Sequence, residues 1–146
     1  MNTKLELSVA VLAASLLLPT AQAADQGGVS IPMLAIPGMN YEMGKYEVTQ
    51  AQLQAVMGSN PSSFSECGDN CPVEQVSWAD IQVFLQKLNA KTGKQYRLPS
   101  EDEWEYACRG GSSSEYCGGD NLDELGWYNS RGKTHPVGFK KPNGYG

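Results

Sequence analysis

Histidine is nearly missing from this chain of 146 residues, which contains His135 and no other histidine. A metal centre built from two histidines and a carboxylate is therefore excluded, and no recognisable motif connects His135 to a nucleophile. The sequence also lacks a G-x-S-x-G nucleophile motif, a phosphate-binding glycine loop and an H-E-x-x-H zinc motif. From its residues alone, the chain shows no active site.

A basic face and long runs of like charge are lacking as well. The formal net charge is -5, with 11 Lys and Arg against 16 Asp and Glu. Nucleic acids and anionic membranes both select a basic surface, so neither is expected as a partner. The absence of a charge run argues against a disordered tail, and the length suits a single domain.

The first two dozen residues have the pattern of a secretory signal. Residues 7–18 form an apolar stretch that is too short to span a bilayer comfortably, and residues 21–23 read Ala-Gln-Ala, the small-x-small pattern of a cleavage site. We expect residues 1–23 to be cleaved, leaving a secreted or periplasmic chain over 24–146 with no membrane association. An uncleaved membrane anchor is the alternative. No cysteine follows the cleavage site, so lipid attachment there is not expected.

Export changes the interpretation of the four cysteines, which are Cys67, Cys71, Cys108 and Cys117. An even number of cysteines in an oxidising compartment indicates disulfides, and four allow three pairings. The most local pairing joins Cys67 to Cys71 and Cys108 to Cys117, closing two short loops. A zinc site made of all four thiolates is the alternative, although C-x3-C and C-x8-C spacings do not match two zinc knuckles.

Capping signals predict three helices. Each begins after a hydroxyl side chain with an acid or amide three residues on, which completes a capping box, and each ends at glycine. They run between Thr49 and Gly58, between Ser77 and Gly93, and between Ser100 and Gly110. Short strands are predicted within residues 30–38 and 94–99, each bounded by proline or glycine.

The acidic cluster after Ser100 is explained by the third helix. Glu101, Asp102 and Glu103 occupy its first turn, where negative charge is favoured by the helix dipole. This interpretation is preferred over a catalytic carboxylate pair. We expect Trp104, Ala107 and Cys108 to form the buried stripe of the helix.

From Gly111 onward the sequence is rich in Gly, Ser, Asn and Pro, and regular structure is not expected. So long an irregular segment needs a disulfide, a bound ion or a partner surface to hold it. Four oxygen donors within it suit calcium but do not match an EF-hand loop, so a solvated loop is the competing interpretation. These donors are Asp120, Asn121, Asp123 and Glu124.

Several motifs together resemble the formylglycine-generating enzyme (sulfatase-modifying factor) family. They are "MLAIPG", "GKYEVTQAQLQAVMG", "NPSSF", "PVEQVSWADIQVFLQKLN", "YRLPSEDEWEYACRGG" and "THPVGFKKPNGYG", in the family's order over residues 33–146. The resemblance implies an irregular α+β fold of the C-type-lectin-like kind, with little regular secondary structure. It identifies residues 24–146 as the amino-terminal portion of such a domain, incomplete at its carboxyl end.

In active members of that family, a copper-binding cysteine pair oxidises a sulfatase cysteine to formylglycine. That pair lies in a part of the domain beyond Gly146, and none of this chain's four cysteines matches it, so no catalytic or cofactor-binding residue is carried over. Copper and structural calcium are implied for intact members alone. We expect this chain to be inactive by itself, with a protein substrate or ligand as partner. A non-catalytic lectin-like binding module and a degenerate fragment are the alternatives.

Overall fold

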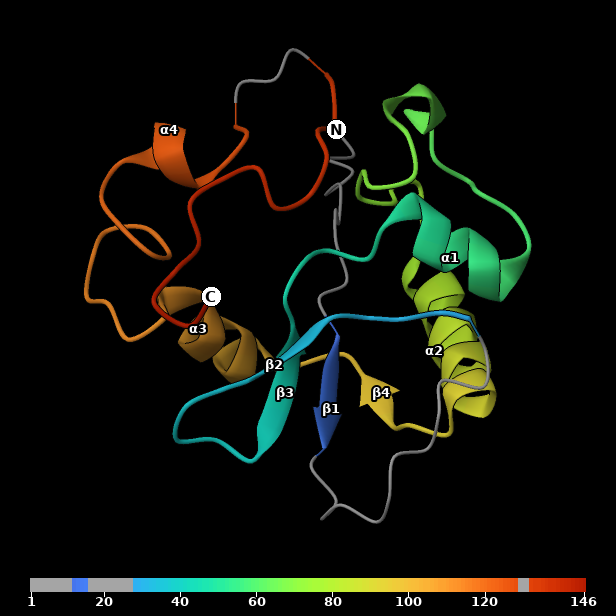
Figure 1. Ribbon diagram of the computed structural model, residues 1–146, viewed down its shortest axis with the longest axis horizontal. Helices are drawn as coiled ribbons and strands as arrows, with labels where there is room; N and C mark the ends of the chain where they lie inside the picture. Colours follow the sequence, from blue (N-terminus) through green and yellow to red (C-terminus); the bar gives the residue numbers. More distant parts are fainter. Residues whose placement is uncertain (1–11, 16–27, 129–131) are drawn as a thin grey trace, which may run out of the picture.

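The computed structural model of the chain describes residues 12–15, 28–128 and 132–146 (Figure 1). Helices and a small antiparallel sheet are mixed, which confirms the predicted α+β class. Its elements are β1 (Ala13–Ser15), β2 (Met33–Ala35), β3 (Tyr41–Gly44), α1 (Gln50–Met57), the 3-10 helix η1 (Ser65–Cys67), α2 (Trp78–Thr92), β4 (Tyr96–Arg97), α3 (Glu101–Arg109) and α4 (Leu122–Leu125).

The sheet has four antiparallel strands in the order β2-β3-β1-β4. β1 is an inner strand although it is the first in sequence. Ala13 lies opposite Met43 of β3 on one side and Arg97 of β4 on the other. The amide of Gly44 also donates to the carbonyl of Leu12 at 2.6 Å. β1 therefore links two strands that do not pair with each other.

β1 lies inside the apolar stretch that the sequence predicts as part of a cleaved signal. The rest of that predicted signal, residues 1–11 and 16–23, lies outside the described residues, and so does the cleavage site. Cleavage therefore stays a prediction. Within the described ranges, none of the helices has the length and apolar character needed to cross a membrane.

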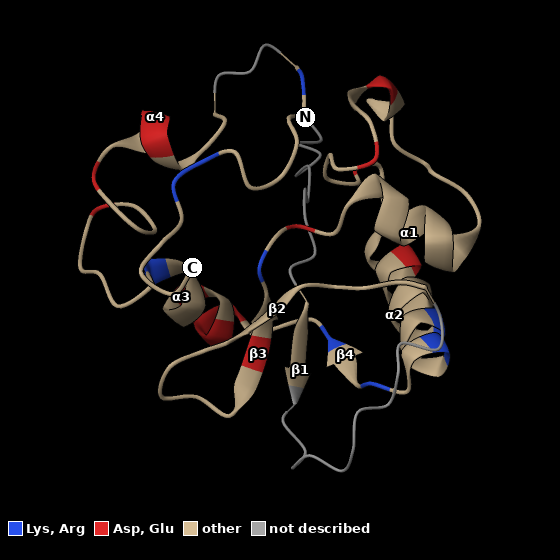
Figure 2. Ribbon diagram, viewed as in Figure 1, with Lys and Arg blue, Asp and Glu red and all other residues tan. Residues whose placement is uncertain are grey.

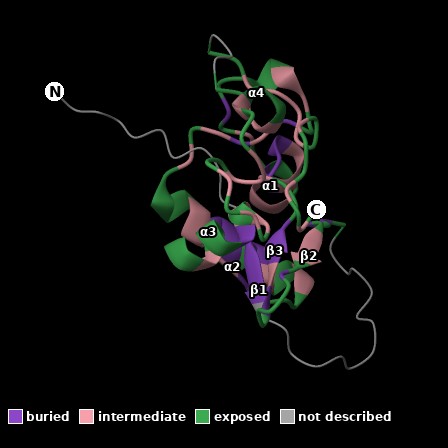
Figure 3. Cartoon of the chain, turned by 90° about the vertical axis from the view of Figure 1, so that its left-hand side faces the viewer, coloured by how far each residue is buried: buried purple, intermediate pink, exposed green. Residues whose placement is uncertain are grey.

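The two faces of the sheet bury two separate clusters. Leu12 and Ala14 belong to the larger cluster with residues of α1 and α2, whereas Ala13 belongs to the smaller one with Ala107 of α3. Successive side chains of a strand point to opposite faces, so β1 contributes to both clusters. α1 and α2 thus cover one face of the sheet and α3 the other, and Figure 3 shows the buried residues concentrated around β1 and β3.

All three predicted helices are confirmed, together with their caps. α1, α2 and α3 each have a complete capping box, formed by Thr49 with Gln52, Ser77 with Asp80, and Ser100 with Glu103. Each ends at a left-handed glycine, with φ values of 84° at Gly58, 71° at Gly93 and 58° at Gly110. Residues with a side chain adopt this conformation at a cost, which explains why glycine ends each helix.

The predicted buried stripe of α3 is wrong at Trp104. Ala107 is buried as expected and Cys108 is half-buried, but the Trp104 side chain is 46% exposed. α3 meets the sheet along a narrow strip, where Ala107 packs in the smaller cluster and the Tyr41 hydroxyl donates to the carbonyl of Glu103 at 3.0 Å. Trp104 lies beside this strip rather than within it.

The irregular carboxy-terminal segment, residues 111–146, is attached to the rest of the fold at a few points. The side-chain amide of Asn143 donates to the carbonyls of Ala107 and Cys108 at 2.7 and 2.9 Å. The amide of Val137 donates to the carbonyl of Asn70 at 2.9 Å. These contacts bring the segment back to the end of α3 and to the loop before α2 (Figure 1).

Candidate binding groove

A groove of about 1200 Å³ lies between the sheet, the loop before α2, α3 and the carboxy-terminal segment. Leu34, Ile36 and Met43 of the sheet region form part of its floor. Large aromatic side chains from several parts of the chain line its walls, and we call it the aromatic groove. The four most exposed of them are Trp78, Trp104, Trp127 and Phe139, and the other two are Tyr46 and Phe64.

All three tryptophans of the chain are in the aromatic groove, and each is substantially exposed. Trp78 is 67% exposed, Trp127 51% and Phe139 75%. Single exposed aromatic residues are ordinary, whereas a group of them lining one concavity is typical of a binding site. Tryptophan offers a large rigid surface for stacking, so the groove is suited to aromatic or aliphatic side chains.

Two side chains contact the Trp127 ring, one by stacking and the other by a cation–π interaction. The His135 ring stacks on it with centroids 3.9 Å apart and planes 19° apart. The ammonium group of Lys140 lies 3.9 Å from the centroid of the Trp127 ring, within cation–π range. The one histidine of the chain thus contacts an aromatic side chain of the groove.

Glu47 gives the groove a polar acceptor. Its side chain lines the groove and is half-buried, and burial raises the pKa of its carboxyl group. Among the described residues it has no hydrogen-bond or ion-pair partner. A desolvated carboxylate of this kind gains by accepting hydrogen bonds from a ligand. The buried hydroxyl of Thr134, also in the lining, likewise lacks a partner within the described part of the chain.

The wall before α2 is fixed by a strained turn. The Glu74 carboxylate accepts hydrogen bonds from the amides of Ser63 and Phe64 at 3.0 and 2.8 Å. Directly after it, Gln75 has a φ of 61°, a conformation that residues with a side chain rarely adopt. Strain of this kind persists where surrounding contacts impose it and is common at binding sites. No local sequence signal predicts this turn, because glutamine is not a residue typical of positive φ.

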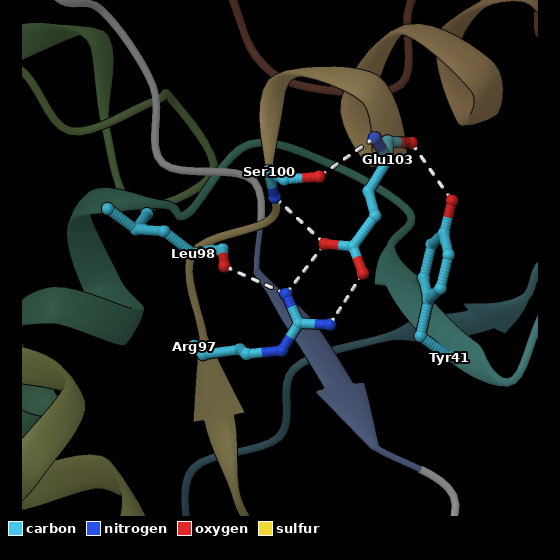
Figure 4. A network of polar contacts seen from close by, with 5 residues as sticks. All are labelled: Tyr41, Arg97, Leu98, Ser100 and Glu103. Carbon is cyan, nitrogen blue, oxygen red and sulfur yellow. Dashed lines mark hydrogen bonds and ion pairs between the residues drawn. The ribbon is translucent and has the colours of Figure 1, made fainter.

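A hydrogen-bonded network positions α3 and therefore Trp104 (Figure 4). The Arg97 guanidinium donates to both carboxylate oxygens of Glu103, at 2.6 and 2.7 Å. The amide of Ser100 donates to the same carboxylate at 2.8 Å. The hydrogen bonds from Arg97, followed by the one from Ser100, lower the pKa of Glu103 to about 2. Sequence reasoning found the cap but missed Arg97.

The remaining acids of the cluster have no common site. Glu105 pairs with Arg109 one turn later, with 3.0 Å between the carboxylate and the guanidinium, and Glu101 and Asp102 are exposed in the first turn. Figure 2 shows acidic residues on α3 and α4, at separate places in the fold. The preference for helix capping over a catalytic carboxylate pair agrees with this geometry.

The cysteines form the two local disulfides predicted from the sequence. Cys67 is bonded to Cys71 and Cys108 to Cys117, with Cα atoms 5.9 and 5.1 Å apart. All four sulfurs are therefore used, so the alternative zinc site of four thiolates is not formed. A copper site of paired thiolates does not fit this chain for the same reason.

The four candidate calcium donors are engaged in local contacts, in which the side-chain amide of Asn121 donates to the Glu124 carboxylate at 3.0 Å. Asp120 accepts from the amide of Glu115 at 2.9 Å, and Asn121 caps α4. Asp123 accepts from the Tyr128 hydroxyl at 2.7 Å, and Glu124 pairs with Lys141 at 3.3 Å. Among the described residues, no three side chains of His, Cys, Asp or Glu gather as metal ligands. The donor set therefore does not fit a calcium ion in this arrangement.

The chain is similar to proteins of two kinds. It is 32% identical to Chaperone protein LppX of Paenibacillus barcinonensis over 73% of this chain and 57% of that protein. It is 33% identical to the formylglycine-generating enzyme of Mycobacterium tuberculosis over 51% of this chain and 28% of the enzyme. The mouse formylglycine-generating enzyme is 34% identical over 75% of this chain and 35% of the enzyme. The chain thus spans between about a quarter and three-fifths of these relatives.

Among solved structures, Treponema denticola variable protein 1 has the same fold, with a TM-score of 0.67 and 26% identity over 92% of this chain and 66% of that chain. This likeness fits the C-type-lectin-like α+β fold that the sequence motifs implied. The sequence pattern described as "Sulfatase-modifying factor enzyme 1-like domain" matches residues 6–146. The chain therefore belongs to the sulfatase-modifying factor (formylglycine-generating enzyme) family.

Proposed function

We propose that this chain is an exported, non-catalytic binding protein of the family, which holds polypeptide segments with aromatic or aliphatic side chains in its aromatic groove. The observation that carries the proposal is that all three tryptophans and Phe139 line one concavity while remaining exposed. An exposed apolar surface of this kind on a folded protein marks a site that a partner covers on binding. The similarity to a protein named as a chaperone supports the same function.

Two further features support the absence of catalysis and the export. All four cysteines are in disulfides, so the chain has no free thiolate of its own to bind copper or attack a substrate. Disulfides persist in oxidising compartments, which agrees with a secreted or periplasmic location. Glu47 supplies the polar contact that would orient a bound segment, by accepting from its backbone or side-chain N–H groups.

The tryptophans make binding directly measurable. A synthetic decapeptide of Phe, Leu and Lys, which contains no tryptophan, is titrated into the chain while intrinsic fluorescence is recorded. We expect saturable quenching or a blue shift, because every tryptophan of the chain lines the groove. A matched peptide with Ser in place of Phe and Leu is the control. Equal responses to both peptides would contradict the proposal.

Substitutions inside and outside the groove test whether the peptide binds there or elsewhere on the surface. Phe139→Ala and Trp78→Ala remove exposed side chains and should weaken peptide binding about tenfold or more, as truncation of aromatic anchors does in interfaces. Val83→Ala removes an exposed apolar side chain of α2 that does not line the groove, and should leave binding unchanged. Equal losses in all three variants would show that binding does not use the groove.

The competing function is oxidation of a sulfatase cysteine to formylglycine, and the similarity to proteins named formylglycine-generating enzymes favours it. The test is to incubate this chain with a cysteine-containing sulfatase peptide, oxygen, a thiol reductant and Cu(I), and to analyse the peptide by mass spectrometry. We expect no aldehyde product. Formation of formylglycine above a copper-only control would replace the binding function with the enzymatic one.

A further inference from the structure

The inner strand of the sheet comes from a segment that has a second predicted role. β1 lies within residues 7–18, the apolar part of the predicted export signal, yet Leu12 and Ala13 are completely buried. Cleavage after residue 23 removes β1 from the chain. The same residues cannot leave with the signal and also remain in the sheet, so processing and folding are in conflict at this strand.

Removal of β1 leaves a gap with a hydrogen-bonding edge on each side. β3 loses its partner at residues 41–43, and β4 loses its partner at residues 96–97. β3 and β4 are not neighbours in the sheet and do not pair with each other. Unpaired backbone groups in a buried sheet are costly, and exposed edges recruit other strands.

The gap also has defined side-chain requirements. Leu12 fills the cluster shared with α1 and α2, whereas Ala13 faces the cluster shared with α3, and Ala14 returns to the first. Both faces are covered, so the strand must be apolar on both. The space accepts one large aliphatic residue followed by two small ones. A bulky or charged residue at the position of Ala13 would collide with the smaller cluster.

We propose that the gap between β3 and β4 is a strand-acceptor site, which in the processed chain takes an extended segment from another polypeptide in place of β1. The incoming segment runs antiparallel to both β3 and β4 and carries a large aliphatic residue followed by two small residues. Main-chain hydrogen bonds supply affinity and the alternating pockets supply specificity, as in other cases of strand addition. This site adjoins the aromatic groove, because Met43 of β3 borders both, but it does not depend on the function proposed for the groove.

The test uses the full chain with a protease-recognition sequence inserted after residue 18. The probe is a fluorescein-labelled peptide of residues 9–18 with two added lysines for solubility. After proteolysis we expect the chain to take up one labelled peptide per molecule, measured by fluorescence anisotropy. The uncut chain should take up at least tenfold less, because its tethered strand competes at an effective concentration in the millimolar range.

Three control peptides distinguish strand insertion from nonspecific apolar binding. Ala14→Pro removes a ladder N–H, and Ala13→Glu introduces a charge into the smaller cluster. Both should lower uptake at least tenfold, as should a scrambled peptide of the same composition. Hydrogen exchange locates the bound peptide, because the amides of residues 41–44 and 96–97 should regain protection when the original peptide binds. Equal uptake of the scrambled peptide would overturn the proposal.

Two other outcomes also overturn it. One is a processed chain that stays monomeric with β3 and β4 amides fully protected and no peptide bound. The other is a processed chain of twice the mass, in which a second copy fills the gap. Should the cut chain aggregate, residues 24–146 are co-expressed with a soluble carrier bearing residues 9–18. Recovery of soluble complex with the original strand and not with its Ala14→Pro variant supports the site, and equal recovery refutes it.

Discussion

The two parts of this molecule differ in where they place their apolar side chains. In the scaffold, made of β1 and residues 28–110, the sheet and α1, α2 and α3 enclose the buried clusters. In the carboxy-terminal segment, no described residue is buried, although Trp127 and Phe139 are large and apolar. The scaffold encloses the buried clusters and exposes Trp78 and Trp104 at the groove, whereas the described residues of the segment add no buried side chain and expose Trp127 and Phe139 there.

The comparison predicts that truncating a leucine to alanine lowers the free energy of unfolding more in the scaffold than in the carboxy-terminal segment. The largest loss is expected at Leu88. Leu88 is fully buried in the larger cluster, so Leu88→Ala should lower the free energy of unfolding by about 2–5 kcal/mol. Leu122→Ala, in the half-exposed α4, should lower it by about 1 kcal/mol or less. Urea denaturation followed by circular dichroism measures both. Equal losses would remove the distinction between the two parts.

Opening the disulfide between Cys108 and Cys117 should loosen the segment and leave the scaffold ordered. A loop of sequence separation 9 contributes about 2–3 kcal/mol by chain entropy. In the double variant Cys108→Ser, Cys117→Ser, hydrogen exchange should quicken over residues 111–128 while the amides of α2 keep their protection. The matched variant at Cys67 and Cys71 should act on the loop before α2 instead. Loss of protection in α2 would show that the two parts unfold together.

The ion pair between Arg97 and Glu103 should make the scaffold sensitive to acid. The folded protein holds the pKa of Glu103 at about 2, below its ordinary value of 4.5, so the stabilisation is complete above pH 4.5 and is lost as the pH falls toward 2. Both side chains are partly exposed, and solvent screening limits the effect to about 1–2 kcal/mol.

Glu103→Gln should therefore lower stability at pH 7 and flatten the decline between pH 4.5 and pH 2, measured by urea denaturation at a series of pH values. Glu101→Gln, in the same helical turn without the partner, is the control. An unchanged pH profile in Glu103→Gln would contradict the role of this pair in fixing α3.

The smallest effect is expected at the strained turn in the groove wall. Gln75→Gly should raise the midpoint of denaturation by the equivalent of about 0.5–1 kcal/mol, because glycine adopts a φ of 61° without steric cost. Gln75→Val should lower it, since a β-branched residue is poorly tolerated there. A Gln75→Gly variant that is more stable and also binds peptide less well would support a role of the strained turn in binding.

The helices and disulfides could be predicted because their signals are local. A capping box and a terminal glycine lie within a few residues of the helix they bound, as at Ser100 and Gly110. The two disulfides close short loops, so the nearest pairing was also the correct one. The helix and strand signals of the sequence already indicated an α+β domain, and the family resemblance added its C-type-lectin-like kind.

The groove could not be predicted, because it depends on contacts between distant residues. Trp104 has the spacing of a buried residue, and its exposure follows from how narrowly α3 contacts the sheet. The bond between Tyr41 and Glu103 joins residues 62 positions apart, which no local pattern reveals. The role of β1 was hidden for another reason: an apolar run suits both an export signal and a buried strand.

The contact of Asn143 with the end of α3 has a consequence for how this protein can vary. Its side-chain amide donates to the Ala107 and Cys108 carbonyls, so the chain that leaves α3 at Gly110 returns to the same end of α3 at Asn143. The free-energy cost of closing a loop between two such points grows slowly, by about 0.6 kcal/mol for each doubling of the loop length. Insertions and substitutions between Gly111 and Pro142 should therefore leave the scaffold intact. The loop between α3 and Asn143, part of which lines the aromatic groove, can therefore change in sequence without any change in the fold that carries it.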